Sequence, residues 1–367
     1  MLFGFGKSTF LGVDFGTSSI KAVELAQKEN GPVLINCAKV PLQLPEKKAA
    51  DGRSYDELIA LHLRALISRM KPASKEVYVA IPAFSGLVTL IDMPEMDEKE
   101  LDQAIKFEAH KYIPSSLDDL ILSWDTVGYW EKQGDRPATM EILLVAALKK
   151  DVGRYQEYLK KANLSMKLLE LETFSLVRAI IGEKPGVSLI IDIGARATNL
   201  VLVHDGRVKV SRNIDGGGND LTRTLMESMG ITQERAETLK KSQKDFLNTP
   251  ESSIIFPVLQ TITAEAQRIL SAYQAKHPEA PVAHAMLSGG TAQLTGLVTY
   301  LEKIFKIPVV VGNPWETVRR ESSGGFEIDS SFFVALGLAL SGMENPAARK
   351  KYGKKSPSLK EILNKKI

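Results

Sequence analysis

The sequence predicts an α/β protein built from two related lobes and one inserted subdomain. Its 367 residues, 44% hydrophobic and 25% charged, are typical of a globular chain long enough for two or three packed domains. A strand, a turn of small residues and a second strand occur twice, and the Asp-x-Gly of the first copy lies 178 residues before that of the second. Between residues 84 and 165 the pattern changes to strand, helix, strand, strand, helix, which indicates an inserted unit.

The elements expected for the first lobe begin with the first copy of this hairpin. Residues 10–25, FLGVDFGTSSIKAVEL, place two apolar strands around a Gly-Thr-Ser-Ser turn. Residues 55–70 predict a helix, because leucine and isoleucine recur there at helical spacing. Short apolar runs predict further strands at 33–40 and 77–83. The first lobe is expected to consist of residues 1–83 and 166–185.

The insert and the second lobe follow along the chain. In the insert, the sequence predicts a strand, a helix, two strands and a helix at 86–94, 98–114, 120–131, 140–150 and 152–164. Residues 188–208 repeat the hairpin, and residues 216–274 predict mainly helices. The second lobe is expected to span 186–345. The tail, 346–367, is expected to stay solvated, because three apolar residues in a lysine-rich stretch bury little surface, and a contact with anionic lipid or a partner is the alternative.

Charge and cysteine content exclude several classes of protein. Cys37 is the one cysteine, so no internal disulfide and no cysteine-rich metal site can form, which fits a reducing cytoplasm. The longest apolar run, residues 332–343, is 12 residues long, whereas a span of the bilayer needs roughly 20. The tail carries 8 Lys/Arg and 1 Asp/Glu, so the net charge of +3 leaves −4 on the remainder. This acidic body argues against nucleic acid as a partner.

The glycine-rich turns carry the chemistry. Glycine lets backbone N–H groups approach phosphate oxygens closely, so Gly16, Thr17 and Ser18 predict a phosphate-binding turn. Asp14 and, in the second copy, Asp192 precede these turns, where each carboxylate would hold a hydrated Mg²⁺ against the phosphates. For one Asp-x-Gly alone, capping of its own turn is an equally good explanation. The duplication favours phosphate and predicts a cleft between the two halves.

Other nucleotide and hydrolase motifs are absent from the sequence. GFGKST at residues 4–9 lacks the first glycine of a P-loop and has no strand before it, so we interpret it as a lead-in to the first strand. The chain has no HExxH, CxxC or GxSxG motif, and its five histidines are scattered. The motifs therefore argue against a zinc enzyme and a serine hydrolase.

Five segments in order resemble the motifs of the actin-like ATPases. They are LGVDFGTSSIK for the first phosphate motif, LLELETFSLVRAI for the first connecting motif, LIIDIGARATNLVLV for the second phosphate motif, AMLSGGTAQLTGL for the adenosine motif and FFVALGLAL for the second connecting motif. The resemblance covers residues 11–340. It implies the two-lobed, ribonuclease H-like fold of that superfamily, with ATP and Mg²⁺ bound between the lobes.

Within this superfamily the chain resembles the PilM family of type IV pilus assembly proteins, to which the FtsA cell-division family is related. KFEAHKYIP at residues 106–114 is similar to a Glu-Ala-x-Lys-Tyr-Ile-Pro stretch of PilM proteins, and both families carry an extra subdomain where the insert lies. The resemblance implies a cytoplasmic protein that binds the amino-terminal segment of PilN at the inner membrane and contacts other pilus proteins. An FtsA-like scaffold and a small-molecule kinase are the alternatives, and homo-oligomer formation is left open.

The resemblance also implies the residues of the nucleotide site. Asp14 and Asp192 would hold the metal through water. Glu172 takes the place of a glutamate that orients the attacking water in many relatives, while Thr173 replaces the proline that follows it there, so a water-orienting role and a hinge-side acceptor role stay open. The implied set is Asp14, Gly16, Thr17, Ser18 and Lys21 in the first half, Asp192, Gly194 and Thr198 in the second, Gly289 and Gly290 at the adenosine, and Glu237 and Lys240 at the ribose and base.

Two questions about activity and partner remain open at this point. The chain is either a slow Mg-dependent ATPase or a scaffold whose bound ATP keeps the lobes closed. The partner peptide is expected on the insert where it meets the first lobe, with Tyr112 and Ile113 at a groove edge and with Ile105 and Phe107 either in the groove or in the core. The strands GLVTLID and MEILLVA are expected to offer an exposed sheet edge.

Overall fold

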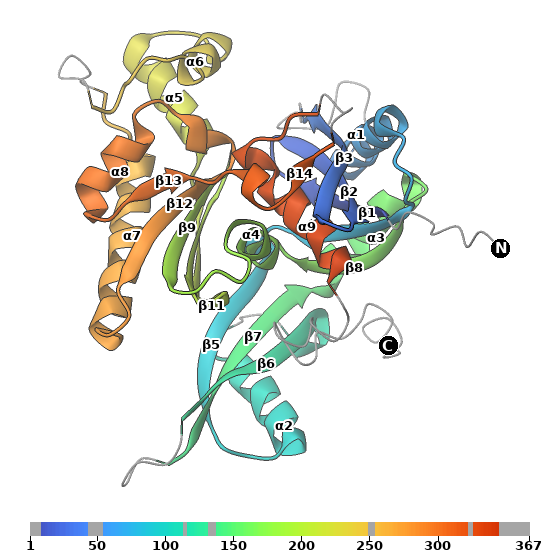
Figure 1. Cartoon of the computed structure of the whole chain (residues 1–367), viewed down its shortest axis with the longest axis vertical. Coiled ribbons are helices and arrows are strands. Elements are labelled where there is room, and N and C mark those ends of the chain that lie inside the picture. Colours follow the sequence, from blue (N-terminus) through green and yellow to red (C-terminus); the bar gives the residue numbers. More distant parts are fainter. Residues whose placement is uncertain are drawn as a thin grey trace.

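The computed structural model arranges the chain as three sheets, two of them in large lobes and the third projecting away from both (Figure 1). It describes residues 9–42, 54–112, 116–130, 137–248, 254–321 and 326–344. The basic tail and all but the last residue of the GFGKST segment lie outside these residues. The short 3₁₀ helices are η1 (Ala83–Ser85), η2 (Leu117–Asp119), η3 (Gly290–Gln293), η4 (Pro314–Glu316) and η5 (Ser330–Phe332).

The first lobe is built on a six-stranded sheet in the order β14-β3-β2-β1-β4-β8. β1 runs antiparallel to β2 and parallel to β4. Both faces of the sheet are covered, because Leu11 and Val13 pack with α1 while Val23 and Leu25 pack with α9. The strands are β1 (Thr9–Phe15), β2 (Ser19–Lys28), β3 (Gly31–Pro41), β4 (Glu76–Ile81), β8 (Ser165–Leu171) and β14 (Arg319–Arg320).

Helix α1 (Tyr55–Met70) covers one face of this sheet and has the bounds that its spacing predicts. Ser54 and Glu57 form a capping box, in which Ser54 Oγ accepts a hydrogen bond from the Glu57 N–H and the Glu57 carboxylate accepts one from the Ser54 N–H. Lys71, with φ of 49°, ends the helix in the left-handed conformation. The buried Leu63 places the apolar stripe of the helix on the sheet.

Helix α3 (Lys149–Lys161) packs on the first lobe, although we expected it within the insert. The Tyr158 hydroxyl donates a hydrogen bond to Asp56 at the start of α1. The rings of Tyr155 and Tyr158 lie 5.1 and 5.8 Å from that of Phe15, which ends β1. Burial of these aromatic rings against α1 and β1 is the physical reason for the placement, and it depends on contacts remote in the sequence.

The second lobe is built on a five-stranded sheet in the order β11-β10-β9-β12-β13. Its core lies between this sheet and the helices α5 to α8, with Leu189 and Ile191 of the sheet fully buried against Leu259 and Ile262 of α7. The strands are β9 (Val187–Ile193), β10 (Thr198–His204), β11 (Arg207–Ile214), β12 (Val282–Ser288) and β13 (Val309–Val311), and the helices are α5 (Gly218–Met229), α6 (Gln233–Lys240), α7 (Pro257–Lys276) and α8 (Leu297–Phe305).

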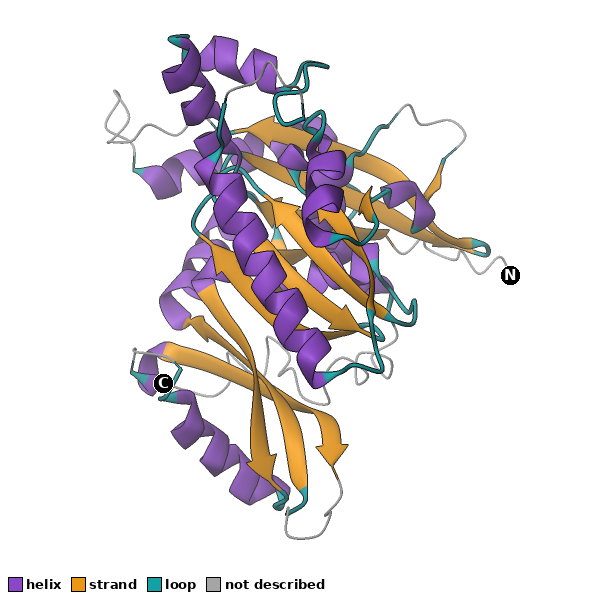
Figure 2. Ribbon diagram, turned by 90° about the vertical axis from the view of Figure 1, so that its left-hand side faces the viewer, coloured by secondary structure: helices purple, strands orange, loops and turns teal. Residues whose placement is uncertain are grey.

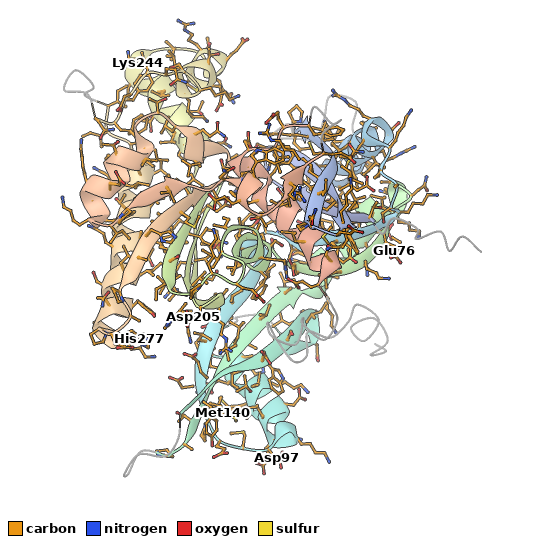
Figure 3. All side chains as sticks on the ribbon, viewed as in Figure 1. Glu76, Asp97, Met140, Asp205, Lys244 and His277 are labelled. Carbon is orange, nitrogen blue, oxygen red and sulfur yellow. The ribbon has the colours of Figure 1, made fainter. Side chains whose placement is uncertain are left out.

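The insert is an antiparallel sheet, β5-β7-β6, with helix α2 on one face (Figure 2). Its distal end carries Asp97 and Met140, far from Lys244 in the second lobe (Figure 3). α2 ends at Ala109, earlier than predicted, because tighter turns follow it, with the Tyr112 N–H bonded to the Ala109 carbonyl. The elements are β5 (Gly86–Pro94), α2 (Glu98–Ala109), β6 (Leu120–Trp130) and β7 (Thr139–Leu148).

The insert is joined to the second lobe by polar contacts with β11. The Lys209 ammonium lies 2.6 Å from the Glu141 carboxylate of β7, and both side chains are largely buried. The Arg207 guanidinium donates to the Val127 carbonyl of β6 at 2.9 Å. Because the partner of the buried Glu141 charge belongs to the second lobe, this contact fixes how the insert is oriented relative to that lobe.

Two helices, α4 (Glu172–Ile180) and α9 (Phe333–Met343), cross between the lobes. A Cβ at Gly337 would lie 2.0 Å from the Ser175 carbonyl oxygen of α4, and one at Gly12 of β1 would lie 2.1 Å from the Ala335 carbonyl oxygen of α9. Only glycine permits approaches this close. The crossing therefore sets how the first hairpin is held relative to the second lobe.

Candidate functional site

The first hairpin turn encloses an ion pair. Asp14 of β1 lies opposite Lys21 of β2 in the strand register, and the Lys21 Nζ is 3.2 Å from Asp14 Oδ2 with both side chains largely buried. A Cβ at Gly16 would be 3.6 Å from that Nζ, so the turn folds closely over the pair. Thr17 is half-buried and Ser18 is exposed at the tip. The hairpin thus places a carboxylate, an ammonium and a small-residue turn together.

The second hairpin has the same plan, with Asp192 near the end of β9, but a different turn. The Gly194 N–H donates to the Ala197 carbonyl at 3.0 Å, while the Gly194 carbonyl accepts from the Gly218 N–H at the start of α5 at 2.9 Å. A Cβ at Gly217 would lie 2.5 Å from Gly194 O. The turn is therefore clamped by the N-terminus of α5.

Charged residues of the two hairpins influence one another. Burial raises the pKa of Asp192 to about 6, and the negative charge of Asp14 adds to the rise. A hydrogen bond with Ser288 of β12 and the positive charge of Lys21 oppose it. Because Asp14 and Lys21 belong to the first lobe, these interactions bring the predicted residues of both lobes within electrostatic range of one another.

Glu172, the first residue of α4, lies in the same site. Its Oε1 accepts a hydrogen bond from the Ala83 N–H at 2.9 Å. Burial raises the pKa of Glu172 to about 8, and the charge of Asp192 adds to the rise. At neutral pH the Glu172 carboxyl is therefore mostly protonated, so it has to lose a proton before it can accept one from an attacking water.

Thr173 and Thr198 are both fully buried and engaged in hydrogen bonds. The Asn199 amide donates to Thr173 Oγ1 at 3.2 Å, so the residue in the place of the family's proline joins α4 to β10. The Thr198 hydroxyl donates to the Gly216 carbonyl at 2.8 Å. Since a hydroxyl has one proton to donate, this bond leaves Thr198 no donor for a phosphate, in contrast to what we expected from the sequence.

The residues predicted to meet adenosine, ribose and base contact the end of β9 and the start of α5. Gly289, with φ of 87°, packs where a Cβ would lie 2.4 Å from Ile193 O, whereas Gly290 has open space at its Cβ position. The Lys240 ammonium bonds the Gly218 carbonyl at 2.9 Å and the Glu237 carboxylate at 2.6 Å. Burial alone would raise the pKa of Glu237, but hydrogen bonds from Lys240 and Thr222 hold it below its ordinary value. Their role toward ribose and base stays a prediction.

Tyr155 and Ser288 lie at the site but were not singled out from the sequence. Burial raises the pKa of Tyr155 far above its ordinary range, and Glu172 and Asp14 act on it through their charge. Ser288 lies directly beside Asp192 in the parallel pairing of β12 with β9. Tyr155 stands in no motif and reaches the site through the packing of α3 on β1. Ser288 lies inside the adenosine motif, directly before Gly289, but only the register of β12 with β9 shows that it lies beside Asp192.

The site fits a cation held through water rather than directly. Among the described residues, no group of three or more His, Cys, Asp or Glu side chains is placed to hold a metal ion. Asp14 and Asp192 nevertheless supply two carboxylates in the same electrostatic environment, and the raised pKa of Asp192 indicates negative charge that the protein leaves incompletely compensated. Carboxylate oxygens and retained water are the ligands that Mg²⁺ prefers.

Comparisons with known proteins show which protein families this chain resembles. Residues 12–343 match the family model described as type IV pilus assembly protein PilM. The cell division protein FtsA of Neisseria meningitidis serogroup B (strain MC58) is 23% identical over 264 residues, which is 63% of this chain and 64% of that protein. The chain thus aligns with less than two thirds of the length of this FtsA.

Solved structures show the same fold. A structure described as a PilM–PilN type IV pilus biogenesis complex has a TM-score of 0.76 and 26% identity, over 92% of this chain and 99% of that one. MreB5 of Spiroplasma citri, bound to ADP, has a TM-score of 0.50 and 17% identity over 93% and 98%. The predicted actin-like ATPase fold is confirmed.

In the part of the chain that the structure describes, no helix has the length and apolar content to cross a bilayer.

Proposed function

The chain belongs to the PilM family of type IV pilus assembly proteins, and on that premise we propose that it is the actin-like, ATP-binding component of a pilus machine. In this proposal it holds the amino-terminal cytoplasmic segment of PilN, and PilN keeps it at the inner membrane. The similarity to the PilM–PilN complex carries the proposal, because it extends over 92% of this chain and 99% of that one.

ATP binding is supported by the two facing hairpins. The Gly16 turn would wrap the phosphates, with Lys21 as the cation beside them. Asp14 and Asp192 would hold a hydrated Mg²⁺, which when bound neutralises phosphate charge. In this proposal Glu172 would orient the attacking water, and the raised pKa of its carboxyl predicts slow hydrolysis whose rate increases as the pH rises through about 8.

A thermal melt tests nucleotide binding. We expect Mg-ATP at 100 times its Kd to stabilise the wild type by about 2.7 kcal/mol, since ligand binds only the native state. Asp14→Ala should lose most of this shift, whereas Asp92→Ala, an exposed acid on the insert, should keep it. A wild type whose melting temperature is unchanged at millimolar Mg-ATP would contradict the assignment of the site.

The PilN surface is proposed on the insert beside α2. Phe107 is 74% exposed and Tyr112 is 43% exposed, whereas Ile105 is 1% exposed and belongs to the core of the insert. Ile113 lies outside the described residues. The expectation that MEILLVA offers an edge is wrong, because β7 is the central strand of the sheet β5-β7-β6. An added strand would have to pair with an outer strand, β5 or β6.

Peptide titration tests this surface. The probe is a labelled peptide with the amino-terminal cytoplasmic sequence of the PilN protein from the same organism. We expect Phe107→Ala combined with Tyr112→Ala to weaken binding at least tenfold, and Ile255→Ala, which removes an exposed apolar side chain from the second lobe, to leave it unchanged. If the folded double variant binds the peptide with unchanged affinity, the peptide binds another surface. If the wild type does not bind the peptide, PilN is not the partner.

A further inference from the structure

A row of charged side chains crosses the first sheet beside the candidate site. Lys39 of β3 lies opposite Lys21 of β2 in the register, and Lys21 lies opposite Asp14 of β1. Directly opposed residues in neighbouring strands project from the same face, so the three side chains stand side by side. Two of them are lysines, and like charges in this position repel and destabilise a sheet.

Lys39 is the uncompensated member of this row. The ammonium of Lys21 is paired with Asp14, whereas no described carboxylate lies within ion-pair distance of Lys39. The charged groups that act on Lys39 are Lys21, Asp329, Lys241 and Asp14. The Lys39 side chain is exposed, so its ammonium is in contact with water. Partial desolvation and the charge of Lys21 lower the pKa of this ammonium.

Two of the charged groups that act on Lys39, Lys241 and Asp329, belong to the second lobe. Lys241 follows the last residue of α6, the helix that carries Glu237 and Lys240. Asp329 already accepts hydrogen bonds from the Ser331 N–H and hydroxyl, at 2.8 and 2.6 Å, so its carboxylate is engaged. The next residue, Ser330, donates its hydroxyl to the Gly289 carbonyl of the adenosine motif at 3.1 Å. Lys39 thus lies opposite Lys21 of the phosphate hairpin and within electrostatic range of Asp329, whose neighbour Ser330 bonds the adenosine motif.

We propose that Lys39 is a phosphate-binding residue of the nucleotide site, whose ammonium contacts the phosphate chain of a nucleoside di- or triphosphate together with Lys21. The inference rests on the proposed ATP site and adds a residue to it. A polyanion between Lys21, Lys39 and Lys241 would replace mutual repulsion with attraction to each ammonium. Lys39 should therefore favour ligands with more phosphate charge over those with less.

Calorimetric titration of ATP, ADP and adenosine into the full chain tests the proposal. Lys39→Met is expected to weaken ATP binding at least tenfold and ADP binding less, and to leave adenosine binding within twofold of wild type. The melting temperature of the nucleotide-free variant should be unchanged or higher, because one repulsive charge is gone. Lys167→Met is the matched control, since it removes an exposed lysine of β8 that pairs with Glu76.

The outcomes separate this inference from the site it extends. If Lys39→Met binds ATP within twofold of wild type while Lys21→Met no longer binds ATP, the proposed role of Lys39 is wrong. The assignment of the ATP site would then still hold. An equal loss for ATP and adenosine with a lower melting temperature would show a structural role and also overturn it. A wild type that does not bind ATP would overturn both the role of Lys39 and the nucleotide site.

Discussion

The two hairpins share a sequence plan but differ in how their aspartates are compensated. Asp14 has Lys21 opposite it in the register, 3.2 Å away, so the first hairpin carries its own countercharge. Asp192 has Asn199 in the equivalent place, and the amide of Asn199 donates to Thr173 instead. The compensation of Asp192 therefore comes from Ser288 of β12 and from Lys21 of the first lobe.

This difference makes the second hairpin dependent on the first lobe. The turn of the second hairpin is rigidly clamped by α5, but its carboxylate relies on the other lobe or on a bound cation. A nucleotide with its metal would supply the missing positive charge while its phosphates meet Lys21. Two copies of one motif have thus become an ion pair within the first hairpin and, in the second, an acid whose compensation comes from other elements.

Gly337→Ala should have the largest effect, because it disturbs the crossing that holds the hairpins opposite each other. The added Cβ would meet the Ser175 carbonyl at 2.0 Å, and forcing α4 and α9 apart should cost about 3 kcal/mol of stability or more. Gly153→Ala in α3 is the matched control, since its Cβ position is open and alanine should stabilise that helix by about 1 kcal/mol. Urea unfolding of both variants measures the difference, and equal stabilities would show that the crossing is not tight.

The same substitution at the two aspartates should have opposite effects on stability without nucleotide. Asp14→Asn leaves Lys21 buried without its partner and should destabilise the fold by about 3 kcal/mol. Asp192→Asn removes a carboxylate whose pKa is raised from 3.8 to about 6. Because the folded pKa lies above the unfolded one, the stability that Asp192 contributes is present below pH 3.8 and is lost as the pH rises through about 6.

The Asp192→Asn variant should therefore exceed the wild type in stability above pH 6 and lose that advantage near pH 4. Thermal melts from pH 4 to 8 measure both changes. If Asp192→Asn destabilises the fold at pH 8, the Asp192 carboxylate is fully compensated within the protein. The proposed difference between the two hairpins would then be wrong. Because Asp192 and Glu172 interact, the fitted pKa values belong to the pair.

Glu172→Gln tests which carboxyl takes part in hydrolysis. We expect any phosphate release to fall about a hundredfold, a typical contribution of a positioned base, while the Mg-ATP melting shift survives. In the wild type the rate should rise between pH 7 and 9, because Glu172 has to deprotonate through a pKa of about 8. If the variant hydrolyses ATP as fast as wild type, Glu172 does not orient the attacking water. If neither protein hydrolyses ATP, the result favours a scaffold whose bound ATP keeps the lobes closed.

Thr198→Val should have the smallest effect and should separate the structural from the binding residues of the second hairpin. Loss of the hydrogen bond to the Gly216 carbonyl should cost about 1 kcal/mol of stability. ATP affinity should stay within about twofold of wild type, because this hydroxyl has no free proton for a phosphate. A tenfold loss of affinity would restore the phosphate-binding role that the sequence suggested.

The sequence by itself determined the local elements and the chemistry of the turns. The leucine spacing of residues 55–70 predicted α1 at its observed bounds, and the alternation around Asp14 and Asp192 predicted both hairpins. Such patterns are readable because each depends on residues within a few positions of one another. The five ordered motifs and the insert pointed to the family by resemblance, and the match over residues 12–343 confirmed it.

Only the tertiary structure decided what depends on contacts between distant segments. Strand order made β7 central and placed Lys39 beside Lys21, and the burial of aromatic rings drew α3 to the first lobe. Burial also raised the pKa of Glu172, although the sequence shows only a glutamate in the first connecting motif. Register, burial and charge environment arise when segments far apart in the chain are packed together, so no local pattern encodes them.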